Sequence, residues 1–378
     1  MTSNELEILC IGNALVDVFA QGDEHVDIRY GITQPVQHVE IDKLREILSV
    51  LPKFTVVSGG GAANVAKIAG LLGTKTGFTG ALGRGKTEGR SSQADEFGRL
   101  FEENLSAAGV KLRLPLKPSP TGICLILQTE EGETRIAASP SAALELSEDD
   151  INEDDLRNAK AVVIDGFMLD RPGLVRHILD LADQYGTTAA IDLSSPIIAE
   201  ERVVEILDYA RQHSLILFMN DTEAESFYKG LKNHGMEVRD MGLVIDEDEQ
   251  GSSSFSVERR KPGSPFRRIC SFFKILTDGN IFPIIVIKQG PRGAIVFAGG
   301  NIHRAETLAV IPLETTGAGD AFSAAFLTAW VRNKSLSECA AVANKAARII
   351  LDVAGTKVDR KPLQSIARQL RQTPVNEA

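Results

Sequence analysis

Short, almost entirely apolar runs recur along this chain, and they constrain its fold more than any other feature. Four of them are Ala161–Ile164, Thr188–Ile191, Leu215–Phe218 and Ile284–Ile287, and Leu6–Ile11 near the start of the chain is similar. A strand with one face in water alternates apolar and polar residues, whereas a continuous apolar run suits a strand covered on both faces. We therefore expect a buried central sheet.

Amphipathic segments lie between these runs. Residues 174–184 and 200–212 carry apolar side chains at helical spacing, and each separates two predicted strands. Further helices are expected at 42–50, 62–72 and 94–107. Strands that alternate with helices predict an α/β fold in which right-handed crossovers build a mainly parallel sheet. Ligands of such sheets bind outside the carboxyl ends of the strands.

Two stretches depart from this rhythm. Thr121–Ala137 holds two apolar runs around the charged sequence Glu-Glu-Gly-Glu, which is typical of a β-hairpin and suggests a small antiparallel layer that stands off the main sheet. Residues 235–268 are poor in large apolar residues and rich in charged residues, Gly, Ser and Pro, which predicts a flexible surface insertion. Because the strand pattern resumes at Ile284, we expect residues 1–378 to form a single domain.

Composition and charge exclude several classes. Of the 378 residues, 43% are hydrophobic and 24% charged, as in a globular protein with a sizeable core. A net charge of −10 argues against a nucleic-acid binder, although local amides can still bind ATP. No apolar stretch is long enough to span a membrane. We expect a cytoplasmic protein, because no signal peptide opens the sequence and the four cysteines have no C-x-x-C spacing.

A glycine-rich turn precedes one of the strongest predicted helices. The sequence Leu313–Asp320 (LETTGAGD) leads into residues 321–331, which favour a helix. Gly317 and Gly319 let backbone N–H groups converge at the helix N-terminus, where anions bind. An Asp in that first turn is well placed to take a proton from a hydroxyl that attacks a phosphate. Taken alone, a helix-capping Asp explains the same residues.

A second glycine cluster opens the helix predicted at 62–72. Gly59–Gly61 permit close approach of a ligand to the backbone, and Asn64 offers both a donor and an acceptor to hydroxyls. A flexible helix entry with an Asn cap explains the cluster equally well. Just past the first predicted strand, the Asp17 carboxylate could accept hydrogen bonds from two vicinal hydroxyls, with Asn13 nearby. An ordinary surface Asp is the alternative there.

A third motif points to a different chemistry. Gly80–Thr87 (GALGRGKT) fits the phosphate-loop pattern G-x-x-x-x-G-K-[ST]. Such a loop opens an apolar-faced helix, but the polar residues 88–93 follow here, and one of them is a helix-weakening glycine. We expect an exposed turn, and we keep a phosphate-loop ATPase that uses Lys86 as an alternative function.

Three separated motifs together resemble the ribokinase-like, or PfkB, family of carbohydrate and nucleoside kinases. They are Gly59–Asn64, Asn220–Glu223 (N-x-x-E) and Thr315–Asp320, in the family's order. Gly12–Asp17 is similar to the family's opening strand on its adenosine-kinase side. The resemblance implies a three-layer α/β/α sandwich with a mainly parallel central sheet. It also implies a small β-sheet lid, formed from about residues 17–40 and 118–140.

The resemblance implies a role for each matching residue. Asp320 would be the base that activates the acceptor hydroxyl. An anion hole for the transferred phosphate would be formed by Gly317, Ala318 and Gly319. The acceptor would be held by Asn13, Asp17, Gly60, Gly61 and Asn64. ATP would be bound by Asn220, Gly290, Gly293 and Asn344. Glu223 would order Mg²⁺ through water.

The implied activity is phosphoryl transfer from ATP to a hydroxymethyl group of a sugar or nucleoside. An adenosine or ribose-like acceptor is expected, with Mg²⁺ as cofactor, K⁺ as a candidate monovalent cation, and a monomer or homodimer as the assembly. The chain departs from the family at Glu314, where Asp is usual, and at Ala138–Ser141, which replaces a segment that often contacts substrate. A non-catalytic sugar- or nucleotide-binding protein on a kinase fold is the second alternative.

Overall fold

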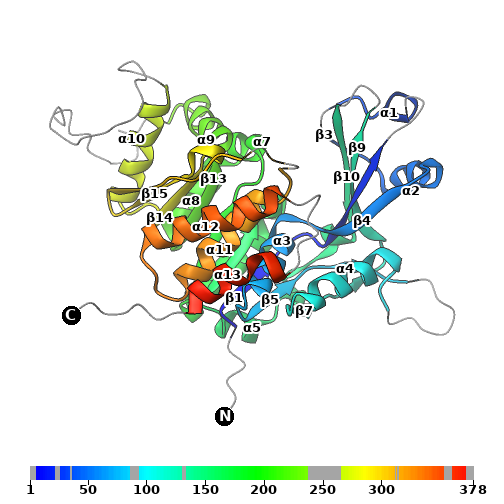
Figure 1. The fold of residues 1–378 in the computed structure, drawn as a ribbon, viewed down its shortest axis with the longest axis horizontal. Coiled ribbons are helices and arrows are strands. Elements are labelled where there is room, and N and C mark those ends of the chain that lie inside the picture. The colour runs from blue at the N-terminus through cyan, green and yellow to red at the C-terminus, as the bar shows by residue number, and fades with distance from the viewer. Residues whose placement is uncertain are drawn as a thin grey trace, which may run out of the picture.

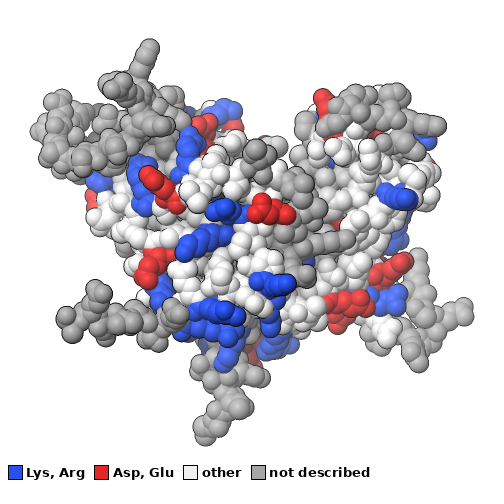
Figure 2. Space-filling model, viewed as in Figure 1, with Lys and Arg blue, Asp and Glu red and all other residues white. Residues whose placement is uncertain are grey.

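The computed structural model shows two large β-sheets (Figure 1), and its described residues also include a two-stranded sheet of β6 (Leu82–Gly83) and β8 (Leu116–Lys117). It describes residues 6–21, 26–34, 36–85, 93–129, 133–236, 265–310, 312, 315–352 and 360–371. No helix in these ranges combines the length and the apolar character that crossing a membrane requires. In Figure 2 a notch separates the part that contains the small sheet from the rest of the molecule.

The larger sheet contains every predicted buried strand. Among the described residues it has nine strands, in the order β16 (Asn301–Ala305), β15 (Ala294–Ala298), β14 (Ile284–Lys288), β13 (Leu215–Asn220), β12 (Thr188–Asp192), β11 (Ala161–Asp165), β1 (Ile8–Ile11), β5 (Thr76–Thr79) and β7 (Lys111–Arg113). Neighbouring strands from β14 to β7 pair in parallel. The outermost strands on the other side, β15 and β16, add antiparallel pairs. The expected mainly parallel sheet is confirmed.

Both faces of this sheet are covered, which explains the continuous apolar runs. Successive residues of a strand point to opposite faces. In β13, Ile216 and Phe218 join one hydrophobic cluster, whereas Leu215 and Leu217 join the other. The first cluster includes residues of α3 (Gly61–Leu71), α4 (Glu96–Ala107), α11 (Ala318–Trp330), α12 (Leu336–Leu351) and α13 (Arg360–Arg371). The second includes residues of α6 (Pro172–Tyr185), α7 (Pro196–Glu201), α8 (Val203–Gln212), α9 (Asp221–Asn233) and α10 (Pro265–Asp278).

Two predicted boundaries are wrong. The helix expected at 200–212 is two helices, α7 and α8, which meet at Arg202. Their buried residues, Ile198 and Val203 among them, join the same cluster, so the apolar period continues across the break. The last residues of the segment expected as an insertion, 235–268, are helical, because α10 begins at Pro265. Proline disrupts a helix interior but is tolerated in the first turn. Residues 237–264 lie outside the described ranges.

The smaller sheet contains the predicted hairpin. Its order is β3 (Val36–His38), β10 (Thr134–Ser141), β9 (Thr121–Gln128), β2 (Leu15–Gln21) and β4 (Phe54–Gly59). β9 and β10 are antiparallel, but β2 pairs with β9 in parallel and β3 pairs with β10 in parallel. The layer is therefore mixed and not antiparallel as predicted, because β2 reaches β9 from far away in the sequence. Its strand β4 also lies outside the two segments expected to form a lid.

Candidate active site

Four neighbouring strands of the larger sheet end in polar residues at one edge. The last residues of β11, β12, β13 and β14 are Asp165, Asp192, Asn220 and Lys288. The strands are parallel and in register, with Asp165 opposite Asp192 and Asn220 opposite Lys288. Three ionisable side chains and one amide therefore converge at the carboxyl edge, where ligands of such sheets bind.

Two glycine-rich helix starts meet at this edge. Gly317 has a left-handed backbone (φ 78°) and caps α11, and Asp320 lies partly buried in the first turn of that helix. The Asp320 Oδ2 atom accepts a hydrogen bond of 2.9 Å from Nδ2 of Asn64 on α3. The two helices pack against each other near the centre of Figure 1. Asp320, which was predicted as the base, thus contacts Asn64, which was predicted to bind the acceptor substrate.

The residues that surround the Gly59–Gly61 segment leave little room for side chains in it. Gly60 has φ 97°, and a β-carbon there would lie 2.3 Å from the Asn13 carbonyl oxygen. A β-carbon at Gly59 would lie 2.2 Å from Oδ1 of Asp17. The Asp17 carboxylate therefore lies against the backbone of the glycine cluster. Gly60 requires glycine, whereas a side chain at Gly59 would have to displace the Asp17 carboxylate. The structure thus brings Asn13, Asp17 and the cluster together.

Arg171, which the sequence analysis did not identify, fixes the orientation of Asn13. Its Nη2 donates to Asn13 Oδ1 at 2.6 Å, and its Nη1 donates to the Ala143 carbonyl at 2.6 Å. A guanidinium has donors only, so the Asn13 side chain must offer its oxygen to Arg171. The amide nitrogen of Asn13 is then left as a donor for other groups.

Lys288 and Asp192 form a buried ion pair. Lys288 Nζ donates to both carboxylate oxygens of Asp192, at 2.8 and 2.7 Å, and Ser323 Oγ on α11 donates to one of them at 2.6 Å. A β-carbon at Gly319 would lie 3.5 Å from Lys288 Nζ. The lysine charge therefore lies next to the backbone of the glycine turn that opens α11.

Burial shifts the protonation of this group of residues. It raises the pKa of Asp320 to about 7, with a further rise from the Asp192 charge, while the Asn64 hydrogen bond and Lys288 oppose it. Burial also raises the pKa of Asp165 to about 6. For Lys288, burial favours the neutral form, but the charges of Asp192 and Glu223 outweigh it and raise its pKa. The edge thus holds several carboxylates with few cations to balance them.

The N-x-x-E motif forms a reciprocal cap at the start of α9. Asn220 Oδ1 accepts from the Glu223 backbone N–H at 2.9 Å, and the two Glu223 oxygens accept from the backbone N–H and the amide of Asn220 at 2.8 and 2.7 Å. Burial raises the pKa of Glu223, and the Lys288 charge opposes that rise. The motif therefore has a clear structural role, whatever it binds.

The predicted ATP-binding residues Gly293 and Asn344 meet at one carbonyl. Gly293 has φ 85°, and a β-carbon there would lie 1.9 Å from the Ala305 oxygen. Asn344 Nδ2 donates to the same oxygen at 2.9 Å. Gly290 also has a positive φ, 54°, but open space surrounds it. The turn after β14, which follows Lys288 in the sequence, thus packs against the end of β16.

Comparison with known proteins assigns the family. The model of a protein family described as "pfkB family carbohydrate kinase" matches residues 29–243 and 271–362, which is most of the chain. The chain belongs to the pfkB family. It is a kinase of the sugar and nucleoside class, and its ribokinase-like α/β fold is confirmed.

Relatives of this pfkB kinase span almost its full length. It is 26% identical to "Adenosine kinase 2" of Arabidopsis thaliana over 376 residues, which covers 94% of this chain and 96% of the relative. It is 23% identical to "5-dehydro-2-deoxygluconokinase" of Bacillus subtilis (strain 168), covering 91% and 90%. The crystal structure of adenosine kinase from Sinorhizobium meliloti superposes with a TM-score of 0.75 at 24% identity, covering 97% and 99%.

Some predicted features of this pfkB kinase cannot be placed. Lys86, Thr87 and Glu314 lie outside the described ranges. The described helix nearest after the phosphate-loop motif is α4, which begins at Glu96 and is capped by Asp95. That helix starts well past the G-K-T sequence, unlike the helix that a phosphate loop opens directly.

No role in the site was predicted for Asp165, Asp192 or Lys288 of this pfkB kinase. Each ends a strand, one residue after an apolar run that was identified. A charged residue directly after a buried strand is therefore the signal that could have found them.

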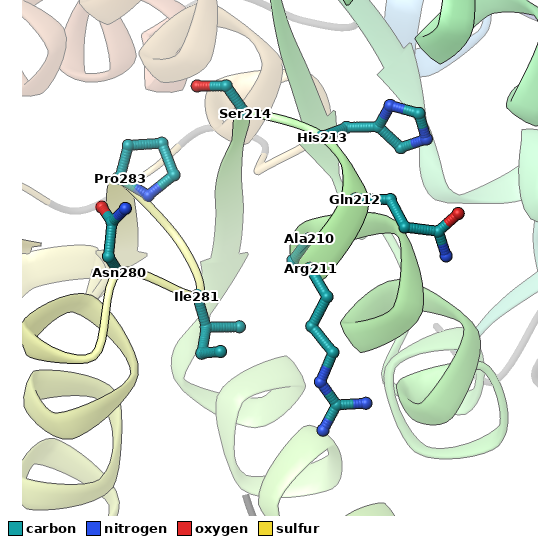
Figure 3. Close-up of a pocket in the computed structure, with 8 residues that line it drawn as sticks. All are labelled: Ala210, Arg211, Gln212, His213, Ser214, Asn280, Ile281 and Pro283. Atoms are coloured by element: carbon teal, nitrogen blue, oxygen red, sulfur yellow. The ribbon is translucent and has the colours of Figure 1, made fainter. Parts of the chain in front are cut away.

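A hollow at the opposite edge of the larger sheet contains none of the predicted site residues. It is lined by Ala210, Arg211, Gln212, His213, Ser214, Asn280, Ile281 and Pro283, as Figure 3 shows. These residues precede β13 and β14, so the hollow lies at the amino ends of those strands. In Figure 3 the Gln212 and His213 side chains point away from Asn280.

Proposed function

We propose that this pfkB kinase transfers the γ-phosphoryl group of ATP to a hydroxymethyl group of a sugar or nucleoside, with Asp320 as the general base. The observation that carries the proposal is the contact between Asp320, at the N-terminus of α11, and Asn64, at the start of α3. The Asp320 pKa of about 7 suits proton transfer near neutral pH. The acceptor oxygen bonds to phosphorus, its proton passes to the Asp320 carboxylate, and ADP leaves.

Asn64 supports a hydroxyl next to Asp320. Its Nδ2 donates to Asp320, so its Oδ1 must act as an acceptor. That oxygen is buried and has no hydrogen-bond partner among the described residues. A buried polar atom without a partner is costly, and a ligand hydroxyl would satisfy it. The same hydroxyl would lie within reach of the base.

The start of α11 supports anion binding. The helix dipole and the amides of its first turn favour negative charge there, and Lys288 adds a full positive charge beside Gly319. The Ala318 N–H already contacts the Thr315 carbonyl at 3.3 Å. We therefore rely mainly on Gly317 and Gly319 for the anion hole, and less on Ala318. Stabilisation of this kind contributes about 3–4 kcal/mol per donor in other enzymes.

Magnesium fits this site as an ion held mainly by ATP. Within the described residues, no three His, Cys, Asp or Glu side chains are placed to hold a metal together. Glu223 uses its oxygens to accept from Asn220, but a carboxylate has lone pairs left for metal-bound waters. Mg²⁺ usually keeps several waters and binds substrate phosphates. When bound, the ion would neutralise phosphate charge, and Glu223 would orient its water shell. The binding of K⁺ stays a prediction, and Glu314, where the family usually has Asp, lies outside the described ranges.

The small sheet is the proposed lid. Asp17 lies on β2 and Gly59 ends β4, so this sheet continues directly into the residues proposed to hold the acceptor. Closure over the cleft would exclude water and so limit ATP hydrolysis. We add β4 to the two segments expected from the sequence, 17–40 and 118–140. The assembly, monomer or homodimer, stays a prediction.

Adenosine and ribose-like sugars are the acceptors that we propose to test first. Adenosine kinases are among the curated relatives and among the solved structures with this fold, and a sugar-acid kinase is also related. We propose the cytoplasm as the location, since all four cysteines are free.

An ADP-release assay with ATP and Mg²⁺ across nucleosides and sugars tests the proposal. We expect at least one acceptor to stimulate ADP release, and Asp320→Asn to lower that rate by about 1,000-fold. Lys86→Ala should leave the rate within about twofold. Loss of turnover in Lys86→Ala alone would favour the phosphate-loop ATPase, and no ADP release with any acceptor would favour a non-catalytic binding protein.

A further inference from the structure

Three residues from three elements meet behind the proposed base. Asp192 ends β12, Lys288 ends β14, and Ser323 lies on α11. The Asp192 carboxylate accepts two hydrogen bonds from Lys288 Nζ, at 2.8 and 2.7 Å, and one from Ser323 Oγ at 2.6 Å. The strand β13 lies between β12 and β14, so Lys288 reaches across one strand to make this pair.

The arrangement ties the first turns of α11 to the sheet. Ser323 follows Asp320 by three residues, and residues at that spacing lie on the same side of a helix. Asp192 is 3% exposed and Ser323 is fully buried, so water cannot easily replace their hydrogen bond. The position of Asp320 therefore depends on a carboxylate that is itself held by Lys288.

We propose that Asp192, Lys288 and Ser323 form a clamp that positions Asp320 and places two opposite charges behind it. These are positioning residues, because they act through Asp320. The inference rests on the proposed role of Asp320 as the base, but the clamp itself can be tested without turnover.

The charges around Asp320 give the expected directions. Asp192 on β12 and Asp165 on β11 disfavour its ionised form, Lys288 on β14 favours it, and so does the Asn64 amide on α3. Arg171 on the loop before α6 balances Asp165. Removing the Lys288 charge leaves Asp192 without its ion-pair partner, so the pKa of Asp320 should rise. Removing the Asp192 charge frees the Lys288 charge, so the pKa should fall. These interactions are strong because the group is poorly solvated.

Titration of Asp320 by NMR tests the clamp directly. The protein is labelled with aspartate carrying ¹³C in the side-chain carboxyl, and the Asp320 signal is assigned by its loss in Asp320→Asn. We expect the midpoint to rise by about one pH unit or more in Lys288→Met and to fall by a similar amount in Asp192→Asn. The acid limb of the kcat/KM profile should move in the same two directions.

Matched variants separate charge from packing. Lys288→Arg keeps the charge, so its midpoint should stay within about half a unit of the wild-type value. Ser323→Ala removes the tether without a charge, so kcat should fall by about tenfold with little shift of the midpoint. Thermal unfolding checks that each variant folds. If one single variant fails to fold, the sign of the shift in the other carries the test. The double variant Asp192→Asn/Lys288→Met should lie within about one unit of the wild type, because it removes two opposite charges together.

The outcomes are distinct. Shifts of the same sign in the two single variants, or none above about 0.3 units, would overturn the clamp. A midpoint shift in Lys288→Arg as large as that in Lys288→Met would also overturn it. So would a double variant whose Asp320 midpoint differs from the wild-type value by more than about one unit. Opposite shifts in a protein without kinase activity would support the clamp and contradict the proposed function.

Discussion

The two edges of the larger sheet carry ionisable groups in different surroundings. At the carboxyl edge, Asp192 pairs with Lys288 and both side chains are largely buried, at 5% and 13% exposed. At the amino edge, next to the hollow of Figure 3, the ring of His213 lies 2.6 Å from a carboxylate oxygen of Asp183, whose side chain is 43% exposed. Water screens the second pair but hardly reaches the first.

This difference indicates which part of the fold lowers the free energy of unfolding. Burial raises the pKa of Asp320 and of Asp165 at the carboxyl edge, which means that ionising them opposes folding. Groups of this kind cluster at functional sites because catalysis needs them. At the amino edge the Asp183 side chain is 43% exposed, so a change of that carboxylate should be tolerated. Four predictions follow from the contrast, and each could break it.

Apart from the loss of activity already expected for Asp320→Asn, substitution Gly60→Ala should have the largest effect. The added β-carbon would meet the Asn13 carbonyl at 2.3 Å in a backbone with φ 97°. We expect kcat/KM to fall by more than about 100-fold, and the free energy of unfolding to fall by about 2 kcal/mol or more. Gly186→Ala is the control, because Gly186 also has a positive φ, 69°, but nothing lies near it. The control should lose stability only, and equal activity loss in both would contradict the account.

Asn64→Ala should have the next largest effect. It removes the hydrogen bond to Asp320 and the proposed acceptor for the substrate hydroxyl. We expect a 30- to 100-fold fall in kcat/KM, that is, about 2–3 kcal/mol. The acid limb of the pH profile should also move to higher pH, because the lost hydrogen bond favours the ionised form of Asp320. An unchanged profile would contradict the contact.

Asp320→Asn should change stability in a pH-dependent way. The folded-state pKa of about 7 exceeds the ordinary value of 3.8, so the folded state binds more protons and stability falls as pH rises between these values. The variant lacks this group, so it should be more stable than the wild type above pH 7, by on the order of 2 kcal/mol. The difference should be small at pH 4. Thermal unfolding at both pH values measures it, and a destabilised variant at pH 8 would contradict the burial of charge.

Asp183→Asn should have the smallest effect. The pair with His213 is exposed to water on the Asp side, and an amide oxygen can still accept from the ring. We expect unchanged kcat/KM and a loss of at most about 1 kcal/mol in the free energy of unfolding by urea titration. A large loss of activity would show that the two edges are coupled.

Much of the fold could be predicted from the sequence, because local patterns specify it. The run Leu215–Phe218 is apolar on both faces because helices cover both faces of β13. The glycines before α3 and α11 identified two helix starts because their backbone conformations and close contacts require glycine. The parallel pairing of β2 with β9 was missed, since no local pattern records which distant strand is a neighbour.

The candidate site was only partly predictable for the same reason. Asp320 and Asn64 were identified through their glycine turns, but their mutual contact joins residues 256 positions apart. Asp192 and Lys288 are 96 positions apart and meet only because β12, β13 and β14 are neighbours in that order. A charged residue after an apolar run is visible in the sequence, but its partner depends on strand order.

The central claim is that Asp320 meets the acceptor hydroxyl at the start of α11. A crystal structure of the kinase with its acceptor and a non-hydrolysable ATP analogue tests it most directly. The account predicts one acceptor hydroxyl within hydrogen-bond distance of both the Asp320 carboxylate and Asn64 Oδ1, with the terminal phosphate at Gly317–Gly319. An acceptor bound away from Asp320, or a phosphate bound at Gly80–Thr87, would contradict it.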